Sequence, residues 1–297
     1  MTALVDLLTR VADWLPFRRE SRARIERWHA RRLTIGPDGL VIGAQSIRLT
    51  GAGTHAALLL HGFNDTPQSM SYLAMALHRA GWTVSVPRLP GHGVSLADMA
   101  RDARATRWRV AVDQAYADLD ASHHHVVVCG QSMGGALAVL LAAHQPKLPA
   151  LVLLAPYLGM PMRIQFQVIT SWLWDVAIPY RIGTGGERSL HDPEAKAQAL
   201  GAGVITSRTM SALRQVARAA EHALAAVKAP TLYLQSREDN RITRRDAERH
   251  FAMLGSVVKD QRWVSGSGHI ISADYCKDTV AQQVIAWFAQ HATAPSE

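Results

Sequence analysis

The sequence predicts an α/β protein with a mostly parallel central sheet and helices on both faces. Two observations support this class: several short runs are apolar at every position, and segments with helical spacing of apolar residues lie between them. A continuous apolar run is typical of a strand that is buried on both faces. Repeated strand–helix units favour a parallel sheet, because each crossover returns the chain to the same edge.

Length and composition indicate one large domain, or a core with an insertion. The chain has 297 residues, of which 48% are hydrophobic and 19% charged, so it can bury a large core and we expect no global disorder. The formal net charge is +8, but the basic residues are scattered or lie on helix-like segments near the start. We therefore expect no nucleic-acid partner, since this charge can equally favour an anionic membrane surface or simple solubility.

Residues 1–37 are predicted to form a helical basic extension. Its apolar positions recur at helical spacing and arginines follow them: Leu4, Leu7, Leu8, Val11, Trp14, Leu15, Arg18, Arg19, Arg22, Arg24, Arg27, Arg31 and Arg32. We favour a helix packed on the main domain or a mobile arm; the alternative is peripheral membrane contact through residues 1–33. No signal-peptide pattern and no run of 18 apolar residues occurs, so a cytoplasmic location is expected.

From residue 38 onwards, short strands alternate with helices. The expected strands, which are bounded by turn residues, are 39–43, 45–49, 56–60, 82–86, 126–129, 150–154, 231–235 and 259–264. The expected helices, which have apolar residues three or four positions apart, are 69–80, 105–121, 136–141, 208–227, 243–254 and 277–291. Gly81 ends the first of these helices, and a turn-rich loop covers 87–93.

The alternation lapses over residues 157–207, which we interpret as a cap or lid insertion over the carboxyl ends of the strands. Residues 38–156 and 208–297 then form the core. The insertion holds many apolar side chains: Met160, Met162, Ile164, Phe166, Val168, Ile169, Trp172, Leu173, Trp174, Val176 and Ile178. They suit a lipophilic lid or acyl pocket, or they attach the cap to the core, and both interpretations stay open.

One pentapeptide, Gly130-Gln131-Ser132-Met133-Gly134, has the pattern of a nucleophile elbow. It follows the expected strand 126–129 and precedes the expected helix 136–141. The serine must lie on a turn so tight that its hydroxyl stands clear of the backbone. Gly130 and Gly134 are small, as neighbouring elements close to such a turn require. The alternative is a glycine-rich turn that happens to contain a serine.

A serine hydroxyl is a weak nucleophile, so it needs a base and a group that orients the base. Asp239 follows the expected strand 231–235 and is the candidate acid, with Glu238 as its rival. Adjacent residues at a loop tip point in different directions, so only one of them should reach the base. His269 lies in a glycine-containing loop before the last helix and is the candidate base.

An oxyanion hole needs two backbone N–H donors. The first should come from Met133, which follows the serine, and the second from Phe63, in the loop after the expected strand 56–60. His61 and His92 are then expected to hold loops by hydrogen bonds.

The cysteines and the run of three histidines do not indicate a metal site. The two cysteines, Cys129 and Cys276, lack ligand-like spacing, and adjacent side chains in the run 123–125 of three histidines diverge, so we expect no disulfide scaffold and no metal.

Together these motifs resemble bacterial carboxylesterases and monoacylglycerol lipases of the α/β-hydrolase superfamily. The resemblance covers about residues 55–290 and rests on five segments: His61-Gly62-Phe63, Pro90-Gly91-His92-Gly93, Gly130-Gln131-Ser132-Met133-Gly134, Arg237-Glu238-Asp239 and Ser267-Gly268-His269-Ile270-Ile271. It implies an α/β-hydrolase fold and a cofactor-free serine hydrolase with a small cap. Residues 1–37 lie outside the resemblance, and the cap departs from it in sequence.

The expected activity is hydrolysis of carboxylic esters through an acyl-enzyme, with short- to medium-chain esters or monoacylglycerols as substrates. One alternative keeps the fold but changes the substrate, as in a peptidase, lactonase, thioesterase or C–C hydrolase. A second alternative is a non-enzymatic binding module.

Overall fold

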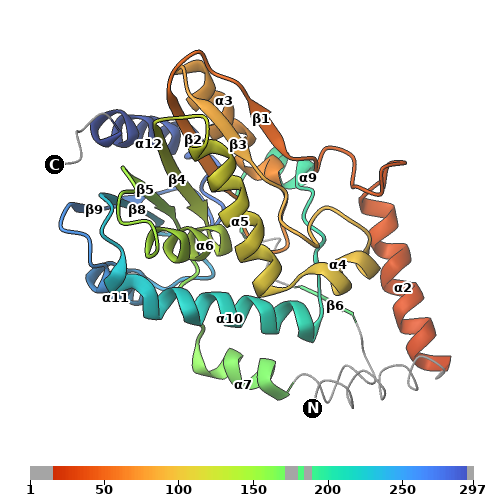
Figure 1. Cartoon of the computed structure of the whole chain (residues 1–297). Helices are drawn as coiled ribbons and strands as arrows, with labels where there is room; N and C mark the ends of the chain where they lie inside the picture. The colour runs from red at the N-terminus through yellow and green to blue at the C-terminus, as the bar shows by residue number, and fades with distance from the viewer. Residues whose placement is uncertain (1–15, 171–179, 184–188, 293–297) are drawn as a thin grey trace.

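The computed structural model describes residues 16–170, 180–183 and 189–292, and it contains a seven-stranded sheet covered by helices on both faces (Figure 1). The strand order is β1-β3-β2-β4-β5-β8-β9. Every pairing in this sheet is parallel except that between β1 and β3. The predicted fold class is therefore confirmed.

The elements of this core follow the predicted order. The strands are β1 (Ile47–Leu49), β2 (His55–Leu60), β3 (Thr83–Val86), β4 (His125–Gln131), β5 (Leu151–Leu154), β8 (Thr231–Ser236) and β9 (Lys259–Val264). The helices around them are α3 (Ser71–Arg79), α4 (Leu96–Asp102), α5 (Ala105–Asp120), α6 (Met133–Ala142), α10 (Ser207–Ala223), α11 (Arg244–Met253) and α12 (Lys277–His291). Short 3-10 turns are η1 (Pro67–Met70) and η3 (Leu224–Ala226).

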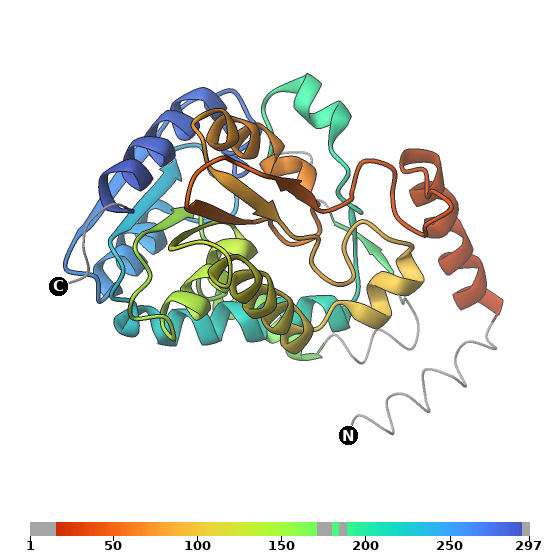
Figure 2. The same ribbon diagram turned by 45° about the horizontal axis from the view of Figure 1, so that its top comes forward.

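The central strands are apolar throughout because each of their faces is covered. In β2, Leu58 and Leu60 pack in the cluster of α5, α6 and α10, whereas Leu59 packs in the cluster of α3 and α12. Figure 2 shows α3 and α12 on one side of the sheet and α5 and α10 on the other. This alternation orients successive side chains to opposite faces and fixes the register, since a shift by one residue would exchange the faces.

One local expectation was wrong, and one helix was not predicted. Residues 39–43 form no strand, because Gly39 and Gly43 adopt φ values of 77° and 88°, which break an extended segment. Only isolated bridges form there, Ile35 with Val41 and Leu40 with Val94. Helix α4 was not predicted: Ser95 begins it by accepting a hydrogen bond from the Asp98 N–H, and it is too short to show a clear helical period.

Between β5 and α10, the described residues form α7 (Met162–Thr170), a small antiparallel pair of β6 (Arg181–Ile182) with β7 (Val204–Ile205), and α9 (Pro193–Gln198). Helix α7 lies beneath α10 in Figure 1. It buries Val168 but exposes Met162 and Phe166. The expected cap residues Trp172, Leu173, Trp174, Val176 and Ile178 lie outside the described residues.

The basic extension contributes α2 (Pro16–Arg32), which lies at one side of the molecule in Figure 1. Its Ile25 is buried in a cluster with Leu96, Met99, Tyr180 and Val204, so the described part of the extension packs on the protein. The apolar positions between Leu4 and Leu15 lie outside the described residues. Across the described ranges, no helix combines the length and apolar character needed to span a bilayer.

Candidate active site

Ser132 lies at the turn between β4 and α6, in a backbone conformation that residues other than glycine rarely adopt. Its φ is 56° and its ψ is −115°. The turn is close-packed: a Cβ on Gly130 would lie 2.2 Å from the Gly134 carbonyl oxygen, and a Cβ on Gly134 would lie 2.1 Å from that of Leu60. Only glycine fits at these two positions, and the strained turn presents the serine hydroxyl at the carboxyl edge of the sheet.

Three side chains predicted from distant parts of the sequence meet at this edge. The Ser132 Oγ lies 2.8 Å from the His269 Nε2, and the His269 Nδ1 lies 2.8 Å from the Asp239 Oδ2. Both His269 and Asp239 are almost completely buried. The distances are those of hydrogen bonds, so the imidazole can accept the serine proton on one nitrogen while donating to the carboxylate from the other.

Asp239 is held more firmly than its neighbour Glu238. Its Oδ1 accepts hydrogen bonds from the N–H groups of Arg241 and Ile242, at 2.6 and 3.0 Å, and its Oδ2 accepts from the Gln235 side chain at 2.7 Å. Burial alone would raise the pKa of Asp239, but His269 and these backbone N–H groups outweigh burial and hold the pKa below its usual value. The carboxylate is therefore ionised at neutral pH.

Glu238 turns away from the imidazole. Its Oε2 accepts hydrogen bonds from the Ser236 hydroxyl, at 3.3 Å, and from the Gly266 N–H, at 3.2 Å. The two adjacent carboxylates thus point in different directions, as the sequence argument required.

The loop of His61, Gly62 and Phe63 lies directly beside the serine. A Cβ on Gly62 would lie 3.4 Å from the Ser132 Cβ. Met133 begins α6, where the first N–H groups of a helix have no partner within the helix. Among the hydrogen bonds of the described residues, none uses the backbone N–H of Phe63 or of Met133. These two groups are therefore available to a developing oxyanion.

His61 and His92 hold the surrounding loops. The Leu89 N–H donates to the His61 Nε2 at 3.1 Å, so the ring proton sits on Nδ1 and is donated to the Gly62 carbonyl at 2.9 Å. Burial, with a smaller contribution from His92, lowers the pKa of His61 well below its usual value, which keeps the ring neutral. The His92 Nδ1 lies 3.2 Å from the Pro90 carbonyl.

Two side chains at the site, Gln235 and Asp65, were not singled out from the sequence, and Gln131 was expected only as part of the elbow. Gln131 donates from Nε2 to the His269 carbonyl at 2.9 Å, and Gln235 donates to Asp239. Asp65 lies two residues after Phe63; its Oδ1 accepts from the Thr66 N–H, but its buried Oδ2 has no partner within the described parts of the chain. Burial raises the pKa of Asp65 to about 6. The sequence could have indicated Asp65 only through its position two residues after Phe63.

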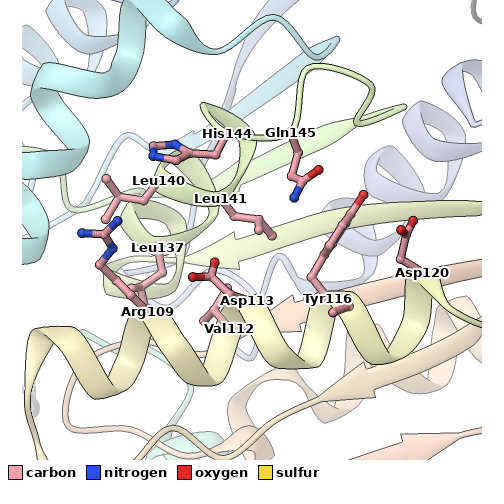
Figure 3. Close-up of a pocket in the computed structure, with 11 residues that line it drawn as sticks. Arg109, Val112, Asp113, Tyr116, Asp120, Leu137, Leu140, Leu141, His144 and Gln145 are labelled. Atoms are coloured by element: carbon pink, nitrogen blue, oxygen red, sulfur yellow. The ribbon is translucent and has the colours of Figure 1, made fainter.

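A separate hollow lies between α5 and α6 (Figure 3), and Ser132 is not among the residues that line it. It is lined by leucines of α6 and by Arg109, Asp113, Tyr116 and Asp120 of α5. Because Ser132 precedes the amino end of α6 and His144 and Gln145 follow its carboxyl end, this hollow is not part of the serine site. In the described portion of the chain, no three His, Cys, Asp or Glu side chains are placed to hold a metal ion.

A parallel sheet with a serine at a strand–helix elbow, and an acid and a histidine in later loops, defines the class of α/β-hydrolase-fold proteins. Residues 53–275 match the family described as "Serine aminopeptidase, S33" (Hydrolase_4), and the chain belongs to this family.

Relatives of known activity cover most of the chain. It is 29% identical to the thermostable monoacylglycerol lipase of Bacillus sp. (strain H-257) over 243 residues. This alignment covers 81% of this chain and 92% of that protein. It is 24% identical to a carboxylesterase of Bacillus subtilis (strain 168) over 232 residues. This alignment covers 78% of this chain and 91% of that protein. The resemblance inferred from the motifs is therefore confirmed.

Solved structures agree with this assignment. A structure from work on LipS and LipT, two metagenome-derived lipolytic enzymes, superposes with a TM-score of 0.77 at 29% identity and covers 84% of this chain and 98% of its own. The monoacylglycerol lipase of Paleococcus ferrophilus superposes with a TM-score of 0.70 at 19% identity, covering 83% of this chain and 98% of its own, and shows the same fold.

Proposed function

We propose that this chain, a carboxylic ester hydrolase, uses Ser132 as nucleophile, His269 as general base and acid, and Asp239 as the group that orients His269. The observation that carries the proposal is the pair of 2.8 Å contacts that connect the serine oxygen, both imidazole nitrogens and a buried carboxylate. The relatives named as a lipase and a carboxylesterase support an ester as the substrate class.

The geometry supports a two-step reaction. As the Ser132 Oγ attacks the ester carbonyl carbon, the His269 Nε2 takes its proton, and Asp239 stabilises the imidazolium through Nδ1. The imidazolium then gives the proton to the leaving alcohol oxygen, which leaves an acyl group on Ser132. Water attacks this acyl group while His269 again takes a proton, and the acid and the free serine are released.

The oxyanion hole is assigned to Phe63 and Met133. Met133 directly follows Ser132, and Phe63 follows Gly62, on which a Cβ would lie 3.4 Å from the Ser132 Cβ; their N–H groups would bind the carbonyl oxygen when it becomes negative. Loss of one such donor typically lowers turnover by about 10²–10³. Phe63 is also positioned by ring contacts with His92 and Trp108, at centroid distances of 6.2 Å each. Its backbone position is therefore tied to the core.

The substrate is proposed to be a short- to medium-chain ester or a monoacylglycerol. We assign residues 157–207 to a cap over the core formed by 38–156 and 208–297. Within it, α7 exposes Met162 and Phe166, which suit contact with an acyl chain. Relatives named as monoacylglycerol lipases support this substrate class, and the cap sequence would set the preferred chain length.

A peptidase is the second candidate, because the description of the matching family names a serine aminopeptidase. Both activities use the same nucleophile. They differ in the leaving group, since an amine must be protonated before it departs, whereas an alcohol is a better leaving group. The two candidates are therefore separated by substrates rather than by the triad.

The test combines labelling with a substrate panel. A fluorophosphonate should label the wild-type chain at Ser132, and Ser132→Ala should abolish labelling and hydrolysis while the protein stays folded. The panel comprises p-nitrophenyl esters from acetate to palmitate, monoacylglycerols and aminoacyl p-nitroanilides. Ester rates well above the anilide rates support the proposal; full ester turnover by Ser132→Ala would refute it.

Contact of residues 1–33 with a membrane surface remains a separate hypothesis, supported by the arginines of α2 and not needed for the chemistry. Flotation of the full chain with anionic and with neutral vesicles tests it. Binding to anionic vesicles that salt removes would support the contact, and no flotation with either kind would contradict it.

A further inference from the structure

Asp274 is a fully buried carboxylate that accepts four backbone hydrogen bonds. Its Oδ2 accepts from the Gly268 N–H at 2.7 Å and from the His191 N–H at 2.9 Å. Its Oδ1 accepts from the Asp192 N–H at 2.8 Å and from the Tyr275 N–H at 2.9 Å. One side chain thus joins the loop that carries His269 to residues 191 and 192, which are 82 or more positions earlier.

The segment 189–192 also contacts the residue on the other side of His269. The Ile270 N–H donates to the Ser189 carbonyl at 2.9 Å, and the His191 Nδ1 lies 3.2 Å from the Gly266 carbonyl. The residues immediately before and after His269 are therefore both fixed by this one contact region. With the Gln131 bond to the His269 carbonyl, the backbone of the base is held on three sides.

The same segment reaches the loop of the acid. The Ser189 hydroxyl lies 3.3 Å from the Asn240 Oδ1, and the Arg241 Nε lies 3.4 Å from the Ser189 Oγ. Asn240 and Arg241 directly follow Asp239. A segment from the insertion after β5 therefore touches the loops of both the base and the acid, although it contributes no group to the triad.

The bonding pattern requires an ionised carboxylate. Four N–H donors converge on two oxygens, and a protonated or amide side chain would place a hydrogen against some of them. Burial by itself would raise the pKa of Asp274, but the N–H groups of Gly268, His191, Asp192 and Tyr275 outweigh it and hold the pKa below its usual value. Such charge-assisted bonds are stronger than neutral ones, which suits a junction that must stay closed.

We propose that Asp274 is a positioning residue that fastens the His269 loop to segment 189–192, so that the insertion helps to fix the catalytic base. This inference rests on the proposed role of His269. A displacement of a reacting group by about 1 Å can cost about 10²-fold in rate. Breaking the junction should therefore lower kcat through His269, although Asp274 touches neither substrate nor serine.

The first test is Asp274→Asn, which keeps the shape but turns an NH₂ group toward two of the four N–H donors. We expect kcat for p-nitrophenyl acetate to fall roughly 10- to 100-fold with little change in KM. The rate of fluorophosphonate labelling of Ser132 should fall by a similar factor. The matched control is Asp278→Asn, at an exposed carboxylate four positions later that bonds to Tyr72; it should keep wild-type values.

Counting the active sites distinguishes a positioning role of Asp274 from a purely structural one. Rates are expressed per serine that the fluorophosphonate labels at completion, at a temperature where circular dichroism shows each variant folded. A structural role would lower the melting temperature and leave the rate per labelled serine unchanged, which would overturn the inference. A lower rate per labelled serine supports it.

A second pair of variants keeps the carboxylate of Asp274 and decides the matter if Asp274→Asn fails to fold. Asp192 has a φ of −63°, which proline can adopt, and its side chain begins α9 by accepting from Glu194 and Ala195. Asp192→Ala loses this cap but keeps the N–H that donates to Asp274, whereas Asp192→Pro loses both. A lower kcat in Asp192→Pro than in Asp192→Ala supports the inference, and equal kcat values overturn it.

The outcomes separate this inference from the proposed function. A wild-type chain without ester hydrolysis and without labelling would refute the function itself. An active wild-type chain whose Asp274→Asn variant matches Asp278→Asn would refute only the positioning role.

Discussion

The edge of the sheet at Ser132 and the helix α7 are built on different principles. At the edge, Gln131 and Met133 are completely buried, and two glycines leave no room for a Cβ. In α7, the Met162 and Phe166 side chains are 84% and 69% exposed. Backbone packing therefore determines the position of Ser132, whereas the exposed residues of α7 can be replaced without loss of core packing. If α7 contacts the substrate as proposed, the difference teaches that the chemistry and the substrate preference of this fold can change independently.

The largest effect, a loss of kcat, is expected at the proposed catalytic acid, Asp239. Asp239→Asn should lower kcat for a short ester about 10³–10⁴-fold, because the amide no longer stabilises the imidazolium or fixes its tautomer. Glu238→Gln is the matched control and should stay within about threefold of wild type, since Glu238 does not reach His269. Steady-state kinetics with p-nitrophenyl acetate measure both. Comparable losses in the two variants would show that the acid is wrongly assigned.

The next effect concerns the elbow itself. Gly134→Ala places a Cβ against the Leu60 carbonyl, which cannot move without distorting β2, so it should lower the free energy of unfolding by about 3 kcal/mol or more. Gly53→Ala is the control, because its nearest neighbour would be the Gly81 oxygen at 3.6 Å, and it should change stability by less than about 1 kcal/mol. Urea unfolding measures both; equal stability would mean that the edge is less tightly packed than described.

A smaller effect is expected at Asp65, beside the oxyanion loop. Its folded pKa of about 6 lies above the unfolded value of 3.8, so the native state binds the proton more tightly and wild-type stability should fall as pH rises between these values. Asp65→Asn removes this cost. It should be more stable than wild type by roughly 2–3 kcal/mol above pH 6 and equal to it below about pH 4. Urea unfolding of both proteins at about pH 4 and above pH 6 measures this. A difference in stability between Asp65→Asn and wild type that did not change with pH would contradict the expectation.

The smallest effect on stability belongs to α7. Phe166→Ser and Val110→Ser remove side chains of similar exposure, 69% and 67%, from α7 and from α5, and neither should change stability by more than about 0.5 kcal/mol. Only Phe166→Ser should alter selectivity, raising KM for long-chain esters roughly three- to tenfold relative to short-chain esters. If both variants leave chain-length preference unchanged, α7 does not contact the acyl chain.

Much of the core could be predicted because its signals are local. The apolar runs of β2, β4, β5 and β8 and the spacing in the large helices depend on neighbouring residues only. Chain order then sufficed to select Ser132, Asp239 and His269, whose contact is seen in the structure and whose chemistry remains a prediction. Residues 157–207 have no such regular apolar spacing. Residues 39–43 were wrongly predicted as a strand because two glycines bend an otherwise strand-like segment.

The supporting side chains could not be predicted for a different reason. Asp274 acts on residues 82 and 83 positions away, and nothing around it in the sequence marks those partners. Asp65 resembles any loop aspartate until its burial is known. Tertiary contacts of this kind become visible only when the chain is folded.

The bond from the Gln131 side chain to the His269 carbonyl has a consequence for motion. Gln131 belongs to β4, in the middle of the sheet, while His269 lies in a loop 138 residues later. That loop cannot swing outward unless the central strand releases it. In amide hydrogen exchange, the segment around His269 should therefore be protected like the interior of the sheet, and this glycine-containing loop should open only together with the buried central strand.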